Sequence, residues 1–172
     1  LLSSEHFVQT VPREMGGVAY WGLAFGRQLT VRASSRGIAT GDGSEWSVSF
    51  RQMPGGEVRE QRSLARERVP VTPADIAAYR ARALRGEAGA SRVIAERMVD
   101  EMPFPKQQPA FVRFEVDERD QVWIEDYQER RNTSVLWYRL GAAATQVRAV
   151  RFPPRFKPLA FTAAMVYGVW RD

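Results

Sequence analysis

Three segments of the 172-residue chain carry the same spacing of strand positions. Each begins with one strand residue and continues with two more at offsets of six and eight residues, which fits two short strands joined by a turn. Positions 40 and 116 lie 76 residues apart, and positions 116 and 161 lie 45 apart. Subtracting a helical stretch from the longer interval leaves a little over 40 residues, which favours four-stranded propeller repeats, although short apolar matches also arise by chance. The positions are Thr40/Trp46/Val48, Val116/Val122/Ile124 and Phe161/Tyr167/Val169.

Strand-like patterning accounts for most of the remaining chain. Alternation of polar and apolar residues predicts pleated strands, and Gly and Pro mark the turns between them. Residues 53–56 suit a tight hairpin, so an antiparallel meander is expected around them. Residues 18–25 fit either a short strand or a buried loop. The predicted strands are 6–11, 29–33, 37–40, 45–52, 57–64, 111–116, 121–127, 134–140 and 145–152, and residues 159–161 and 165–170 resemble the first half of a further hairpin unit.

A helical pair interrupts the strand pattern. The segment 72–75 (Thr-Pro-Ala-Asp) combines an N-cap, a proline at the first helical position and a first-turn acid, which predicts a helix from Pro73 to about Leu84. Helical spacing returns over residues 91–102 and stops at Pro103. We therefore predict a single domain over residues 1–172 with a helical insertion at about 71–103.

The charge pattern disfavours nucleic acid as the partner. The chain has 25 Lys and Arg residues against 20 Asp and Glu residues, a formal net charge of +5. The two signs are interleaved, as in residues 59–62 and 66–68, whereas a nucleic-acid site gathers like charges on one face. Arginine also suits protein interfaces and the surface of anionic lipid.

We find no catalytic, cofactor-binding or metal-binding motif, and we predict that the protein is not an enzyme. The absence of cysteine excludes disulfides, cysteine-ligated zinc and thiol nucleophiles. His6 is the single histidine, no Gly-x-Ser-x-Gly elbow accompanies it, and we expect a half-exposed strand residue. No window approaches 18 uninterrupted apolar residues, so no helix is expected to span a bilayer.

Two acidic clusters have simple structural interpretations. Asp117, Glu118 and Asp120 lack the spacing of a calcium loop, so we expect a solvated hairpin turn. Glu125, Asp126 and Glu129 are expected to form surface pairs with the arginines at 130 and 131. Neither cluster is therefore predicted to bind a metal ion.

Four segments together resemble a known family. They are 71–75, 114–124 with its acidic turn before Val-Trp-Ile, 152–159, and the Gly-Val-Trp-Arg-Asp of 168–172. They look like bacterial exported six-bladed β-propeller proteins of the NHL/TolB-like kind, over about residues 28–172. The resemblance implies a mostly β fold of antiparallel four-stranded blade-like sheets and a periplasmic or extracytoplasmic location. Six blades need about 250 residues, so we expect a partial or truncated propeller, or a fragment of a longer one.

Aromatic residues near the C-terminus supply candidate interface residues. A partial propeller has sheet edges that something must cover, and we expect a partner. Trp137 and Tyr138 are adjacent, so in a strand they point to opposite faces. An outward aromatic beside Arg139, together with Phe156 and Lys157, has the composition of an interface anchor, although packing between blades explains the aromatics as well.

We therefore expect a non-catalytic structural or interaction subunit of a larger bacterial membrane-associated assembly. Its partners would be other protein subunits, with contact to the membrane surface as an option. An accessory subunit of a photosynthetic reaction centre and light-harvesting complex is one specific candidate, which no individual residue carries. One alternative is a propeller-type small-ligand-binding protein or hydrolase. The other is an Arg-mediated binder of anionic lipid or nucleic acid.

Overall fold

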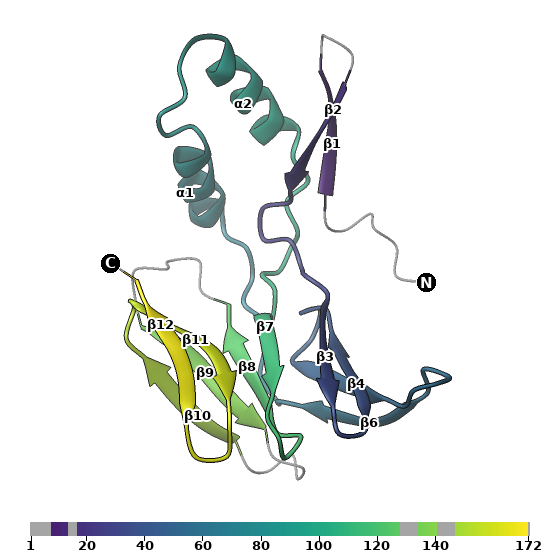
Figure 1. The fold of residues 1–172 in the computed structure, drawn as a ribbon. Coiled ribbons are helices and arrows are strands. Elements are labelled where there is room, and N and C mark those ends of the chain that lie inside the picture. Colours follow the sequence, from purple (N-terminus) through teal and green to yellow (C-terminus); the bar gives the residue numbers. More distant parts are fainter. Residues whose placement is uncertain (1–7, 14–16, 128–133, 141–146, 172) are drawn as a thin grey trace. The chain divides into compact units, whose positions relative to one another are not determined.

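The computed structural model describes residues 8–13, 17–127, 134–140 and 147–171 (Figure 1). The chain divides into two compact units, the first made of residues 1–27 and 69–108 and the second of residues 28–68 and 109–172. That the two units form one domain stays a prediction. The strands are β1 (Val8–Arg13), β2 (Gly17–Gly22), β3 (Thr30–Ser34), β4 (Gly37–Gly41), β5 (Ser47–Arg51), β6 (Val58–Ser63), β7 (Phe111–Val116), β8 (Val122–Asp126), β9 (Val135–Leu140), β10 (Val147–Phe152), β11 (Phe156–Phe161) and β12 (Val166–Trp170).

The helices of the first unit lie close to their predicted positions. α1 spans Pro73–Ala83 and α2 spans Gly89–Glu101. Thr72 caps α1, because its Oγ1 accepts a hydrogen bond from the Asp75 N–H at 3.2 Å and the Asp75 carboxylate accepts one from the Thr72 N–H at 2.9 Å. The predicted start at Pro73 is confirmed. Neither helix in the described ranges combines the length and hydropathy of a bilayer-spanning segment.

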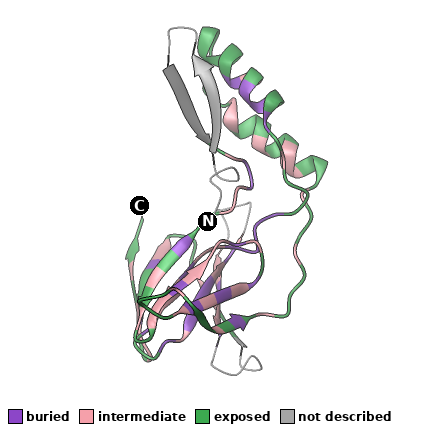
Figure 2. Ribbon diagram, turned by 90° about the vertical axis from the view of Figure 1, so that its right-hand side faces the viewer, coloured by how far each residue is buried: buried purple, intermediate pink, exposed green. Residues whose placement is uncertain are grey.

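A small core holds the first unit together. α1 and α2 are mainly exposed, and α2 buries one stripe that includes Met98 (Figure 2). The Phe25 ring centroid lies 6.2 Å from that of Tyr79 on α1 and 6.4 Å from that of Phe104 after α2. The strands β1 and β2 pair antiparallel in the same unit. Residues 18–22 are therefore part of a strand rather than a buried loop.

The second unit consists of antiparallel sheets. Strands β3 to β6 form one four-stranded meander and β7 to β10 form another, each in chain order, and β11 pairs with β12. The prediction of a mostly β, antiparallel fold is confirmed. None of the sheets in the described part of the chain closes into a barrel.

The sheets pack face to face in chain order. Ala39, Val48 and Phe50 of the β3–β6 sheet pack with Phe114 and Ile124 of the β7–β10 sheet, and all five side chains are at most 1 % exposed. Side chains alternate between the two faces of a strand, so the neighbours of Ile124 point the other way. That second face of the β7–β10 sheet packs against the β11–β12 hairpin.

The matched hairpin patterns occupy different places in their sheets. Val116 and Val122 pair at the turn between the first and second strands of the β7–β10 sheet. Thr40 and Trp46 instead flank the turn between β4 and β5, the second and third strands of the β3–β6 sheet. The spacing therefore locates hairpins without locating one repeated position.

Candidate interaction surface

The β11–β12 hairpin is built around a short turn at residues 162–165. The Thr162 N–H donates to the Met165 carbonyl at 2.9 Å, and the Thr162 hydroxyl oxygen accepts from the Met165 N–H at 2.9 Å. These bonds close the turn and pair Phe161 with Val166. They therefore set which side chains of β12 face the β7–β10 sheet.

An aromatic stack fixes the inner face of the hairpin. The Phe161 ring centroid lies 4.6 Å from that of Trp123 and 4.7 Å from that of Trp137. Gly168 makes room for Phe156, since a Cβ at position 168 would stand 2.5 Å from the Phe156 ring and equally close to the Lys157 carbonyl oxygen. The inner face is thus closely packed.

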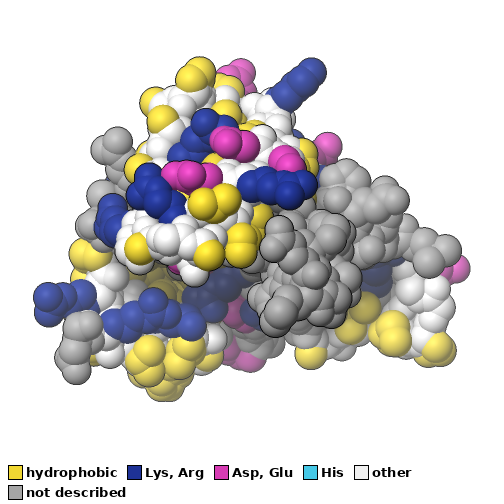
Figure 3. All heavy atoms as spheres, turned by 90° about the horizontal axis from the view of Figure 1, so that it is seen from above, with side chains coloured by type: hydrophobic (Ala, Val, Ile, Leu, Met, Phe, Trp, Pro, Cys, Tyr) yellow, Lys and Arg dark blue, Asp and Glu magenta, His cyan; other side chains and the backbone are white. Residues whose placement is uncertain are grey.

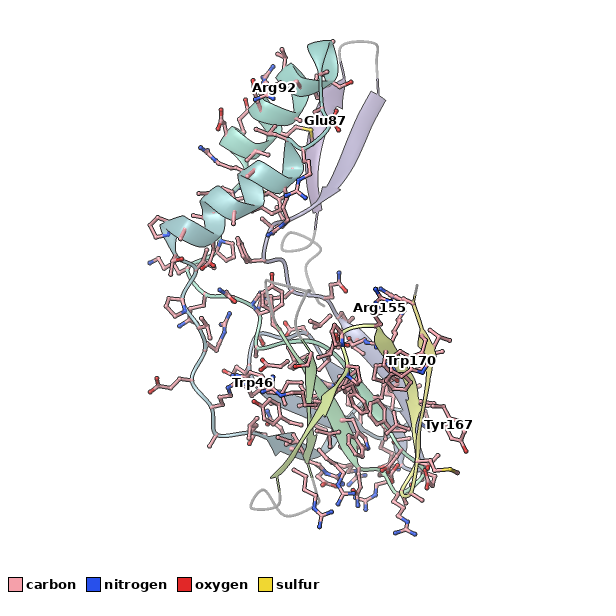
Figure 4. All side chains as sticks on the ribbon, turned by 90° about the vertical axis from the view of Figure 1, so that its left-hand side faces the viewer. Trp46, Glu87, Arg92, Arg155, Tyr167 and Trp170 are labelled. Atoms are coloured by element: carbon pink, nitrogen blue, oxygen red, sulfur yellow. The ribbon has the colours of Figure 1, made fainter. Side chains whose placement is uncertain are left out.

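The other side of the hairpin exposes large apolar residues. Tyr167 and Val169 are 52 % and 45 % exposed, and Tyr167 points away from the sheets in Figure 4. The Tyr167 hydroxyl lies 4.0 Å from the Met165 sulfur, so the turn extends the same apolar surface. Trp170, at the far end of β12, is mostly exposed but lies on the opposite face, where its ring contacts Phe156. We call the outward set the hairpin surface: Leu159, Met165, Tyr167 and Val169.

The register of β12 corrects the sequence alignment. The alignment matches Tyr167 with the buried Val122, but the 162–165 turn is one residue shorter than the turn that joins β7 to β8. Val166 therefore takes the place opposite Phe161. A shift of one residue reverses every side chain of a strand, so Tyr167 and Val169 face outward instead of into the core.

The uncovered face of the β3–β6 sheet has a different composition. A cross-strand row on that face runs through Val31, Thr40, Ser49 and Gln61, opposite to the buried Phe50 side. Thr40 accepts a hydrogen bond from the Arg51 Nε at 3.2 Å. This cross-strand row is therefore mainly polar, with Val31 as its exposed aliphatic member, and Leu29 and Val58 of the same region are also exposed.

Hydrogen bonds and an ion pair connect the two four-stranded sheets around their apolar contact. Asp120 accepts hydrogen bonds from the N–H and the hydroxyl of Ser35, and Arg62 donates to the Asp120 carbonyl. The guanidinium of Arg32 binds both oxygens of Glu115, at 2.5 and 2.8 Å. The expectation of a solvated acidic turn is wrong for Asp120, which is 5 % exposed, because its carboxylate joins the turn to the neighbouring sheet.

The other acids of this turn also have structural roles. Asp117 is buried and accepts hydrogen bonds from the Gln121 N–H at 2.9 Å and from the Trp123 indole at 3.2 Å. The expectation of solvation is therefore wrong for Asp117 too. Glu118 is exposed, and the Ala163 N–H that bonds its carboxylate lowers its pKa. Its bond links the turn between β7 and β8 to the hairpin turn.

Arg66 forms a second polar cluster at the end of β8. Its guanidinium donates to Asp126 at 2.9 Å and to the Tyr138 hydroxyl at 2.8 Å, and it lies 4.7 Å above the centroid of the Trp46 ring. Burial raises the pKa of Asp126, and the Arg66 charge partly offsets this effect. The pKa of Tyr138 is raised by burial and by the Asp126 charge. The expectation of surface pairing is wrong for Asp126, because it is 8 % exposed and pairs with Arg66.

The predicted interface residues do not form one patch. Trp137 is fully buried in the stack with Phe161, and Tyr138 faces the other sheet against Trp46. Both faces of β9 are covered, which leaves Trp137 buried and Tyr138 half-buried, and a role of either in an interface stays a prediction. The Arg139 guanidinium lies 5.6 Å from the centroid of the Trp123 ring.

Only part of the predicted set lies on the hairpin. Phe156 and Lys157 belong to β11 and are half-buried. Sequence reasoning missed the exposed members of the hairpin surface, although the Thr162 turn chemistry held the signal for their register. His6 and positions 128–131, which include Glu129 and its predicted arginine partners, lie outside the described residues. In the ranges described, no three His, Asp or Glu side chains gather in a way that could hold a metal ion.

Searches against protein-family models, curated proteins and solved structures find no match. The functional argument therefore depends on the geometry of the chain itself.

Proposed function

We propose that this chain is a non-catalytic interaction subunit whose hairpin surface docks against an apolar β-sheet face of another protein subunit. The observation that carries the proposal is the hairpin surface, where four large apolar side chains on one side of a two-stranded sheet and its turn are each at least 45 % exposed. Burying a side chain such as Val169 contributes about 1.5–3 kcal/mol. Tyr, Trp and Met are also enriched at protein interfaces.

The layering of the second unit supports a sheet as the occupant. The apolar faces of the β3–β6 and β7–β10 sheets are covered in turn by the next sheet. The first strands β3, β7 and β11 contact one another in sequence, as the innermost strands of propeller blades do. Arg32 of β3 pairs with Glu115 of β7, and Arg113 of β7 donates to the Pro158 carbonyl of β11 at 2.9 Å. A blade-like sheet stacked on the hairpin would continue this arrangement.

Pairing of the helix arginines favours a protein partner over nucleic acid. Arg92 pairs with Glu96 at 2.8 Å and Arg97 with Glu101 at 2.9 Å. Basic and acidic side chains are interspersed on the helical side seen in Figure 3. Such pairing leaves little uncompensated positive potential for a phosphate backbone. We place the partner in a membrane-associated, extracytoplasmic assembly, and the photosynthetic setting stays a prediction.

A matched pair of variants tests the proposal. Val169 and Val31 are both valines on strands and both 45 % exposed, but they lie on the hairpin surface and on the polar sheet face respectively. The tagged chain is isolated from its native source under mild extraction, as wild type, Val169→Lys and Val31→Lys. We expect the wild type and Val31→Lys to retain a stoichiometric partner. The amount of partner isolated with Val169→Lys should be at least about tenfold lower, since a lysine cannot be buried unpaired.

Two outcomes would contradict the proposal. If all three chains retain the same partner, the hairpin surface is not the docking site. If the species lost in Val169→Lys is a homodimer, the occupant is a second copy and the assigned partner is wrong.

A further inference from the structure

The β12 edge of the hairpin is unpaired. Among the strands that the structure describes, β12 pairs with β11 alone, whereas β4 and β8, the second strands of the two four-stranded sheets, have a neighbour on both sides. The main-chain N–H and C=O groups of an unpaired strand need water or another strand as their partner. The hairpin therefore ends at the place where the other two sheets continue with a third strand, β5 or β9.

The main-chain hydrogen bonds at the two ends of β12 identify the residues that face this open edge. The Thr162 N–H donates to the Met165 carbonyl at 2.9 Å. At the other end, the Arg171 N–H donates to the Arg155 carbonyl at 2.9 Å, so positions 165 and 171 both face β11. Main-chain groups along an antiparallel strand point alternately to its two sides. Three residues therefore direct their N–H and C=O groups to the open edge: Val166, Gly168 and Trp170.

The side chains on this edge lie on the inner face of the hairpin. Val166 is opposite the buried Phe161, and Trp170 is opposite Phe156, whose ring it contacts. Trp170 is nevertheless 67 % exposed, although it lies on the side of the hairpin that packs against the β7–β10 sheet. A strand placed along the open edge would cover this ring and extend the apolar layer between the hairpin and the sheet.

The composition of β12 distinguishes its edge from the edges of the larger sheets. The last strands of those sheets, β6 and β10, carry five charged residues: Arg59, Glu60, Arg62, Arg148 and Arg151. Charged residues on an edge strand discourage pairing with another chain. The sequence of β12, Val-Tyr-Gly-Val-Trp, contains none. Its edge is therefore both open and free of the charges that would oppose an added strand.

We propose that the open edge of β12 binds an extended segment of another protein chain, which becomes a third strand antiparallel to β12. Main-chain hydrogen bonds give such pairing its affinity, and alternate side chains give it selectivity. The residues opposite Val166 and Trp170 face the β7–β10 sheet, so the segment carries an apolar side chain at every second position. This site is separate from the hairpin surface, whose side chains lie on the other face of the hairpin.

A peptide with the sequence of residues 45–52 (Glu-Trp-Ser-Val-Ser-Phe-Arg-Gln) serves as the probe. It contains β5, the third strand of the β3–β6 sheet, and it alternates apolar with polar residues. Amide hydrogen exchange of the 172-residue chain, followed by NMR, measures the pairing. With the peptide, we expect the amides of Val166, Gly168 and Trp170 to exchange at least about tenfold more slowly, while those of Tyr167 and Val169, which face β11, change little.

N-methylation of the peptide provides a matched control that needs no variant of the protein. When the apolar side chains of the peptide face the β7–β10 sheet, the Val48 N–H points to β12 and the Ser49 N–H points away from it. The peptide N-methylated at Val48 should therefore bind at least about tenfold more weakly than the unmodified peptide, because it loses a main-chain bond to β12. The peptide N-methylated at Ser49 should bind like the unmodified peptide.

Two variants separate this site from the hairpin surface. Trp170→Lys places a charge on the edge and should weaken peptide binding at least about tenfold. Val169→Lys should bind the peptide like the wild type, although the proposed function predicts that this variant loses its partner subunit. The proposal is overturned if the peptide does not bind or if the two N-methylated peptides bind equally. It is also overturned if a second copy already protects the three amides in the isolated chain.

Discussion

The β3–β6 sheet and the β11–β12 hairpin each have one covered face in the described part of the second unit, but their other faces differ. Thr40, Ser49 and Gln61 form a polar row across the uncovered face of the sheet. Tyr167 and Val169 make the uncovered face of the hairpin apolar. A polar face is stable in water, whereas an apolar face on a two-stranded sheet indicates a contact still to be made. This difference is the reason why we propose the hairpin, rather than the sheet, as the docking site.

Among the variants considered, Phe161→Ala should have the largest effect on stability, because Phe161 joins the covered face of the hairpin to the β7–β10 sheet. Removing a ring that stacks on Trp123 and also contacts Trp137 should lower the free energy of unfolding, measured by urea denaturation, by about 3–5 kcal/mol. Amide hydrogen exchange should locate the lost protection in β11 and β12. If protection falls equally in β3 to β6, the hairpin is not a separate layer and the comparison fails.

Arg62→Ala should have the second largest effect on stability, because it weakens the contact between the β3–β6 and β7–β10 sheets. The Arg62 side chain is 4 % exposed, binds Glu60 at 2.6 Å and lies over the Phe50 ring. Its loss should cost about 2–4 kcal/mol and reduce protection in both four-stranded sheets. Arg59→Ala, whose side chain is 61 % exposed, is the control and should change stability by less than about 0.5 kcal/mol. If the two variants lower stability equally, Arg62 does not stabilise the contact between the two four-stranded sheets.

The pH dependence separates two acids near this contact. Burial raises the pKa of Asp126 above its unfolded value of 3.8, so the folded chain binds the proton more tightly than the unfolded chain does. The stability of the fold therefore falls as the pH rises from the unfolded pKa to the higher folded pKa. Asp126→Asn removes this loss, so its stability relative to the wild type should rise as the pH increases above the unfolded pKa of 3.8.

Glu60 should show the opposite sign. The hydrogen bond from Arg62 lowers the pKa of Glu60 below 4.5, so its contribution is present above the unfolded pKa and lost as pH falls through the folded one. Glu60→Gln should therefore lose stability relative to the wild type as pH rises. Urea denaturation across a pH series measures the stability of each variant relative to the wild type. If this difference changes with pH in the same direction for Asp126→Asn and Glu60→Gln, the opposite pKa shifts assigned to the two acids are wrong.

The smallest effect on stability is expected for Val169→Lys. The residue makes its contacts on an exposed face, so unfolding of the isolated chain should shift by less than about 0.5 kcal/mol, as in Val31→Lys. A loss above about 2 kcal/mol, measured by urea denaturation, would place Val169 in the core of the unit. The comparison between the two uncovered faces would then lose its basis.

Local chemistry made much of the fold predictable from the sequence. The Thr72 cap and Pro73 located the first helix, and alternation located the meanders. The register of β12 was not predictable from apolar spacing, because a one-residue difference in turn length moved Tyr167 from an expected core position to the surface.

Burial of the acids was also beyond the reach of local patterns. Asp120 and Asp126 owe their burial to Ser35 and Arg66, which are 85 and 60 positions away in the sequence. Trp137 and Tyr138 were correctly expected on opposite faces, but only the layered packing reveals that both faces are covered. Non-local contacts of this kind decide which residues remain for a partner.

Oxidation of two matched methionines tests the docking of the hairpin most directly. Met165 on the hairpin surface is 56 % exposed and Met53 is 58 % exposed, so both should react with peroxide at similar rates in the isolated chain. In the native assembly, we predict that Met165 is protected at least several-fold while Met53 keeps its rate, as read by peptide mass spectrometry. Equal reactivity of Met165 and Met53 in the assembly would contradict the account.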